Sequence, residues 1–115
     1  MSNKKYSVTI SKKINKFNKT IRVDSDKSIS IRSFLIGSIS NDISRIRNVL
    51  ESDDVLSAVN CLRKLGIKIQ KQKNKDYYVY GKGIGSLSIK RNGTLNCGNS
   101  GTLARLLIGI LSTTP

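Results

Sequence analysis

The sequence predicts an α/β fold in which helices pack on one side of a mixed β-sheet. Between residues 21 and 80 the expected elements follow the order strand, helix, strand, helix, strand, strand, and a further strand and helix come after them. Apolar residues recur every three or four positions in the expected helices and every second position in the expected strands. This alternation is typical of a layer of helices on a sheet. The 115 residues are enough for one modest domain.

The first elements are two short strands and a helix. Weak alternation over residues 5–14 indicates a possible strand, and Ile21 and Val23 indicate a second. A helix is expected over residues 28–40, with Asp26 or Ser25 as its N-cap. Its inward face should carry Ile31, Phe34, Leu35 and Ile39.

The middle of the chain contains the clearest helical pattern. A short strand is expected over residues 44–49, and the helix after it should be capped by Ser52 and ended by Gly66. Asp53 and Asp54 would favour the positive end of its dipole, so capping explains them without any acid–base role. Residues 67–70 and 77–80 then predict a hairpin around a lysine-rich turn, and residues 87–89 a further strand.

Composition limits the classes of function. A mean hydropathy of −0.26 and short apolar runs describe a soluble protein without a membrane span, and no signal peptide is recognisable, so we expect a cytoplasmic location. The chain has no histidine, which excludes an imidazole acid–base group. Cys61 and Cys97 lie in apolar patterns and are expected to be buried thiols.

A net charge of +14 raises the possibility of a polyanionic partner. The lysines concentrate in residues 4–19 and 64–82, and the second group coincides with the expected hairpin turn. Aromatic residues interleaved with the basic ones, as base stacking requires, are scarce. We therefore expect no nucleic-acid partner, and a basic nucleic-acid-binding module stays as an alternative.

A polar loop at residues 98–102 leads directly into the apolar run of residues 103–111. Glycines permit a tight turn, and the first N–H groups of a helix lack partners, so such a loop can seat an anion. Arg105 lies one turn inside the helix, on the side of the loop, where it would share a ligand or a carboxylate with it. The alternative is an ordinary buried helix capped by Ser100 or Thr102.

A second anion-binding site is expected at the start of the first helix. Ser28 and Arg32 are four residues apart and line one side of its first turn, and Lys27 directly precedes them. A hydroxyl, two cations and free N–H groups would converge there on one anion. A capped helix with solvated cations is the alternative.

The sequences around the two expected anion-binding sites resemble those of a known family. The segments are V-D-S-D-K-S-I-S-I-R at residues 23–32 and G-N-S-G-T-L-A-R-L-L at residues 98–107. Both resemble signatures of the 5-enolpyruvylshikimate-3-phosphate synthases, and E-S-D-D-V, C-L-R-K-L-G and V-Y-G-K-G fall between them in that family's order. The resemblance covers residues 14–111.

The resemblance implies an inside-out α/β barrel built of βαβαββ units, of which about one and a half are present. Residues 21–80 would form the first unit and residues 87–115 the start of a second, within an incomplete substrate-binding domain spanning residues 21–115. Residues 1–20 would belong to the other domain, with a hinge just before Lys27. We accordingly expect a fragment of a longer enzyme, or the product of a truncated gene.

The activity implied is transfer of the enolpyruvyl group of phosphoenolpyruvate to the 5-hydroxyl of shikimate 3-phosphate, in chorismate and aromatic amino acid biosynthesis. No metal or organic cofactor is implied, and family members are usually monomeric. By resemblance, Lys27 would contact both substrates. Ser28 and Arg32 would bind shikimate 3-phosphate, Asn99 and Gly101 would line the phosphoenolpyruvate site, and Thr102 and Arg105 would support that loop.

The resemblance also implies that the proton-transferring carboxylates lie outside this chain, which alone should be inactive. Four positions differ from the usual family pattern: Asp24, Ser25, Ile31 and Leu103. Asp24 adds negative charge beside an anion-binding site, and the bulk of Leu103 would shift its loop. The UDP-N-acetylglucosamine enolpyruvyl transferases, which share the fold but lack the D-K-S-x-S-x-R run, are the alternative enzymes.

Overall fold

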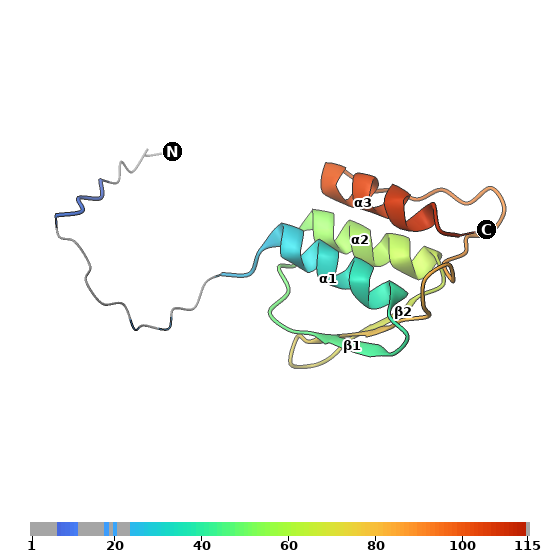
Figure 1. Ribbon diagram of the computed structural model, residues 1–115, viewed down its shortest axis with the longest axis horizontal. Coiled ribbons are helices and arrows are strands. Elements are labelled where there is room, and N and C mark those ends of the chain that lie inside the picture. Colours follow the sequence, from blue (N-terminus) through green and yellow to red (C-terminus); the bar gives the residue numbers. More distant parts are fainter. Residues whose placement is uncertain (1–6, 12–17, 19, 21–23, 115) are drawn as a thin grey trace.

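In the computed structural model, residues 7–11, 18, 20 and 24–114 are described. They form three helices and three strands, shown in Figure 1. In chain order the elements are α1 (Lys27–Ile39), β1 (Ile43–Ile46), α2 (Asp53–Lys64), β2 (Lys68–Lys71), β3 (Tyr77–Tyr80) and α3 (Gly101–Leu111).

The sheet has the strand order β1-β3-β2, and both pairs are antiparallel. Tyr80 of β3 lies opposite Ile43 of β1 on one side and Lys68 of β2 on the other. The predicted hairpin is thus confirmed, as is the short strand before α2. The expected strand at Ile21 and Val23, which would complete a βαβαββ order, lies outside the described residues.

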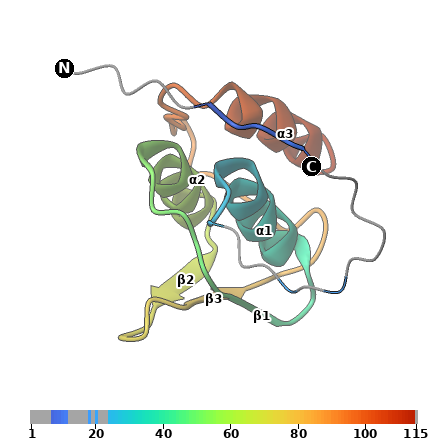
Figure 2. The same ribbon diagram turned by 90° about the vertical axis from the view of Figure 1, so that its left-hand side faces the viewer.

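Helices α1 and α2 cover the same face of the sheet, and α3 lies beyond them on the side away from the strands (Figures 1 and 2). Phe34 of α1 meets Tyr77 of β3 edge to face, with ring centroids 5.2 Å apart. The core has its side chains at most 5% exposed and consists of Ile31, Phe34, Leu35, Val55, Ala58, Val59, Cys61, Leu62, Leu65, Ile67, Ile69, Tyr77, Val79, Leu87, Leu103 and Leu107. Burying this apolar surface is the main force that holds the helices on the sheet.

The first helix begins and ends one residue earlier than predicted. Of its two candidate caps, Asp26 acts: its Oδ1 accepts a hydrogen bond of 2.7 Å from the backbone N–H of Ile29. Ile31, Phe34 and Leu35 are buried as expected, and Ile39 is partly buried against the same core.

The cap of α2 differs from the prediction. Ser52 occupies the N-cap position, but its hydroxyl accepts no capping hydrogen bond and is buried without a partner among the described residues. The predicted Ser52 cap is therefore wrong in its chemistry, although the helix starts where expected. The predicted end is confirmed: the helix stops before Gly66, whose φ of +90° is the left-handed conformation that glycine adopts without strain.

Two further predicted strands fail where the structure describes them. Residues 7–11 form no strand, and Val8 and Ile10 are 86% and 87% exposed; the remainder of that expected strand is outside the described residues. Residues 87–89 form no strand either. Leu87 is buried individually and the Ser88 N–H donates to the Leu65 carbonyl at 3.2 Å, so this segment packs on the end of α2 without joining the sheet.

The last helix is capped by Ser100, which is 4% exposed and whose Oγ accepts a hydrogen bond of 3.1 Å from the Leu103 N–H. Of the two caps considered, Ser100 or Thr102, the structure thus selects Ser100. Among the residues that the structure describes, no helix combines the length and hydropathy needed to cross a bilayer.

The two N-cap serines provide a matched test. We expect Ser100→Ala to lower the free energy of unfolding by about 1 kcal/mol, because the Leu103 N–H loses its partner. Ser52→Ala should leave stability unchanged or raise it slightly, since it removes a buried hydroxyl that has no partner. Urea denaturation of both variants measures this, and equal losses would contradict the difference between the two caps.

Candidate functional site

The N-termini of the three helices lie at the same end of the helix layer (Figure 1). The first turns of α1 and α2 are joined by an ion pair between Lys27 and Asp54. The loop before α3 contacts α2 one turn further on, where a Cβ atom at Gly98 would lie 3.1 Å from the Ser57 Oγ. Three helix dipoles therefore point their positive ends toward one region of the surface.

Lys27 is held by a carboxylate. Its Nζ lies 2.8 Å from Asp54 Oδ2, and its side chain is 48% exposed while that of Asp54 is 18% exposed. The hydrogen bond to Asp54, followed by the charge of the same group, raises the pKa of Lys27 above its ordinary value of 10.5. The ammonium is thus charged at neutral pH and fixed beside the start of α2.

Of the other two residues predicted at the start of α1, Ser28 is half-buried and Arg32 is exposed. Arg32 borders an open groove of about 680 Å³ that runs between α1 and β1. Arg45 and Arg47 border the same groove. The structure therefore brings Lys27 to α2 and places Arg32 at a separate groove, where Arg45 is already ion-paired with Asp76.

The loop before α3 exposes Asn99 and Gly101, and Thr102 is half-buried. The guanidinium of Arg105 lies over this loop: a Cβ atom at Gly101 would be 3.7 Å from Arg105 Nη1. Arg105 is exposed, and its position beside the loop agrees with the helical spacing.

Two of the unusual positions lie in the core. Ile31 and Leu103 are both fully buried. The side chain of Leu103 fills the core, and Ser100 caps the helix that contains it. Asp24 is exposed, two residues before the Asp26 cap.

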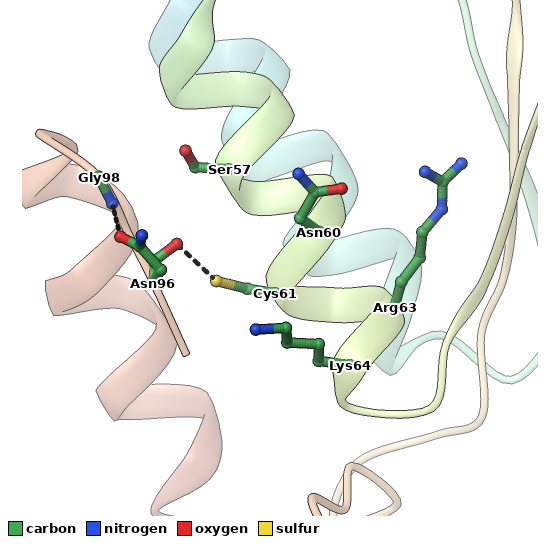
Figure 3. Close-up of a pocket in the computed structure, with 7 residues that line it drawn as sticks. All are labelled: Ser57, Asn60, Cys61, Arg63, Lys64, Asn96 and Gly98. Atoms are coloured by element: carbon green, nitrogen blue, oxygen red, sulfur yellow. Dashed lines mark hydrogen bonds between the residues drawn. The ribbon is translucent and has the colours of Figure 1, made fainter. Parts of the chain in front are cut away.

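A cavity of about 470 Å³ lies between α2 and the chain segment before α3 (Figure 3). It is lined by Ser57, Asn60, Cys61, Arg63, Lys64, Asn96 and Gly98. It contains none of the predicted site residues, although Gly98 directly precedes Asn99. Lys64 and Arg63 donate to the carbonyls of Thr94 and Ile69, so both cations already have acceptors.

Sequence reasoning missed Asp54 as the partner of Lys27. It accounted for Asp54 by the dipole of its own helix, and the carboxylate does lie in the first turn of α2. The pairing arises only because two helices distant in sequence pack with their starts together. No local pattern signals it.

The described chain is thus an α/β unit in which three helices begin on one side (Figure 1), with Lys27 and Arg105 beside two of those starts. Comparison with known proteins specifies the unit further. The family described as EPSP synthase (3-phosphoshikimate 1-carboxyvinyltransferase) matches residues 11–115, and the chain belongs to that family.

Individual relatives agree with this assignment. The 3-phosphoshikimate 1-carboxyvinyltransferase of Caldicellulosiruptor saccharolyticus is 50% identical over 93 residues, which are 81% of this chain and 21% of the relative. That of Bacillus cytotoxicus is 43% identical over 98 residues, 85% of this chain and 23% of the relative. A solved EPSP synthase from Acinetobacter baumannii superposes with a TM-score of 0.72 at 35% identity, covering 82% of this chain and 21% of that one.

The chain thus spans about a fifth of the length of the curated relatives it matches. Its fold, an incomplete α/β arrangement of the EPSP synthase type, is confirmed by the solved structure. The predicted site residues all fall within the matched region of residues 11–115.

The Lys27 ion pair makes a prediction about pKa. Asp54→Asn should lower the pKa of Lys27 toward 10.5, because the hydrogen bond and charge that raise it are removed. Asp53→Asn, which changes the neighbouring carboxylate in the same first turn, should leave the Lys27 pKa unchanged. Following the Lys27 side-chain resonance by NMR from neutral to alkaline pH measures both.

The same pair sets the direction of a stability change. Since the folded pKa of Lys27 lies above its unfolded value, the stabilisation is complete at neutral pH. It is lost as the pH rises past 10.5 and through the folded pKa. A stability profile in which Asp54→Asn differs from the parent only below neutral pH would contradict this assignment.

Proposed function

We propose that this chain is part of a 3-phosphoshikimate 1-carboxyvinyltransferase and supplies one side of its substrate site. The complete enzyme transfers the enolpyruvyl group of phosphoenolpyruvate to the 5-hydroxyl of shikimate 3-phosphate. One observation carries the proposal: the family match extends over residues 11–115 and includes both helix starts that present cations and free amides.

The residue roles follow from charge and position. Lys27, fixed at the meeting point of two helix starts, contacts both substrates. Ser28 and Arg32 hold shikimate 3-phosphate, because a hydroxyl and a guanidinium suit a phosphate group. Asn99 and Gly101 line the phosphoenolpyruvate site at the start of α3, and Thr102 and Arg105 support that loop.

The chemistry needs fixed positive charge more than it needs a cofactor. The 5-hydroxyl adds to C2 of phosphoenolpyruvate, giving a tetrahedral intermediate, and phosphate is then eliminated. Charge that changes during both steps is stabilised by cations and amides that are already in place. The carboxylates that move the protons in such an enzyme lie outside these 115 residues, and the residues proposed here bind the substrates.

The domain organisation we propose follows the same comparison. Residues 21–80 form one βαβαββ unit, of which the structure describes α1 through β3. Residues 87–115 begin a second unit, and residues 1–20 belong to the other domain, with the hinge just before Lys27. The partners are the two small-molecule substrates, and the enzyme acts in the cytosol.

A titration of the isotope-labelled chain with shikimate 3-phosphate, followed by NMR, tests the proposal. We expect the amide resonances of residues 27–32 to shift, and further addition of phosphoenolpyruvate to shift those of residues 99–102. Arg32→Gln should weaken the affinity for shikimate 3-phosphate about tenfold or more, because it removes a charge-assisted hydrogen bond worth about 1.5–3 kcal/mol.

Arg47→Gln is the matched control. Arg47 borders the same groove as Arg32 but is not part of the motif, so its loss should change the affinity by no more than about twofold. A parallel titration with duplex DNA at physiological salt addresses the basic-module alternative. Shifts confined to the lysine-rich hairpin with DNA, and none with shikimate 3-phosphate, would overturn the proposal.

A further inference from the structure

Three contacts fix the segment before α3 along one side of α2. Lys64 Nζ donates to the Thr94 carbonyl at 3.2 Å, and Cys61 Sγ donates to the Asn96 carbonyl at 3.3 Å. Gly98 packs against Ser57. The three contacting residues of α2 are about one helical turn apart, and their partners in the segment are two residues apart. Because the residue numbers rise along the segment while they fall along α2, the segment is extended and runs antiparallel to the helix.

The Asn96 contact places Cys61 beside the residue that directly precedes Cys97. Cys97 follows Asn96 directly, is half-buried, and packs against the core that contains Cys61. Cys61 is 1% exposed but borders the cavity of about 470 Å³ seen in Figure 3. Both thiols are reduced in the structure, and Cys97 is the more accessible of the two.

The ionisation of Cys61 agrees with this proximity. Burial raises the pKa of Cys61 to about 11, and the neighbouring Cys97 thiol, through its charge and a hydrogen bond, adds to the increase. The ammonium of Lys64 acts in the opposite direction. Cys61 is therefore a poor first target for an oxidant, and the reaction begins at Cys97.

We propose that Cys61 and Cys97 form an intramolecular disulfide when the protein meets a peroxide, so that α2 is linked covalently to the loop that begins α3. Hydrogen peroxide oxidises the Cys97 thiol to a sulfenic acid and leaves as water. The Cys61 sulfur then attacks the Cys97 sulfur, its proton is lost, and the hydroxyl departs as a second water. Two thiols and one peroxide thus give one disulfide and two waters.

The crosslink would act on a loop of known position. Residues 98–102 connect the cysteine pair to the first turn of α3, so the disulfide restricts how far this loop moves from α2. The closed loop also limits the unfolded chain, which raises the unfolding temperature of the oxidised form by several degrees. Neither effect depends on the proposed substrates.

The test treats the full chain with hydrogen peroxide, alkylates the remaining thiols, and maps the products by mass spectrometry. We expect a monomer with no alkylated cysteine and a peptide pair joined through Cys61 and Cys97. Capture of the oxidised Cys97 by Cys61 should be at least about tenfold faster in buffer than in concentrated urea, because folding holds the two sulfur atoms together for this second step.

Single variants are the controls. Cys61→Ser should stop at an oxidised Cys97 or a mixed disulfide, and Cys97→Ser should retain a Cys61 that is slow to react. The proposal is overturned if both thiols of the parent remain free, if Cys97 is oxidised further or linked between two chains without capturing Cys61, or if urea does not slow the crosslink.

Discussion

Close packing of α1 on the sheet is the constraint on which the rest of the structure depends. The end of α1 approaches the end of β3 backbone to backbone: a Cβ atom at Gly81 would lie only 2.3 Å from the Ser40 carbonyl oxygen. The Lys82 N–H donates to the Ser38 carbonyl in the same place. This contact fixes α1 along its axis, so the position of its N-terminus follows from the packing at its other end.

Helix positions could be predicted from the sequence because each depends on local spacing. The apolar residues of α1 and α2 recur at helical intervals. α2 ends before Gly66 because glycine adopts the left-handed backbone conformation found there. The hairpin followed from alternation around a polar turn. These features need no knowledge of the tertiary structure.

Other features depend on tertiary contacts and could not be predicted. Ser52 has the right residue type for a cap, yet its hydroxyl is buried and accepts no bond from the helix. Residues 87–89 alternate as a strand would, but among the described residues they pair with no strand, and Leu87 fills the core near the end of α2. The site is similar: the residue types at Lys27 and Asn99 were recognised, whereas the Asp54 partner came only from the way two helices pack.

Within the region that matches the EPSP synthase family, the two motifs contain both buried and exposed positions. Ile31 and Leu103, which differ from the usual family pattern, are both fully buried in the core. Exposed Arg32, Asn99 and Gly101 contribute little to packing. The division between the two groups runs through both motifs, with inward positions serving the core and outward positions available to a ligand.

The pairing of Lys27 with Asp54 has a consequence for any negatively charged molecule that arrives there. The Lys27 ammonium is already held in place by Asp54, so its side chain would lose less conformational freedom when an anion binds. The anion must also displace the Asp54 carboxylate or share the ammonium with it, so its affinity is the difference between its own attraction to Lys27 and that of Asp54. A ligand with several negative charges would compete with Asp54 for Lys27 more effectively than a monovalent ion does. Asp54 would therefore both orient Lys27 and favour multiply charged ligands.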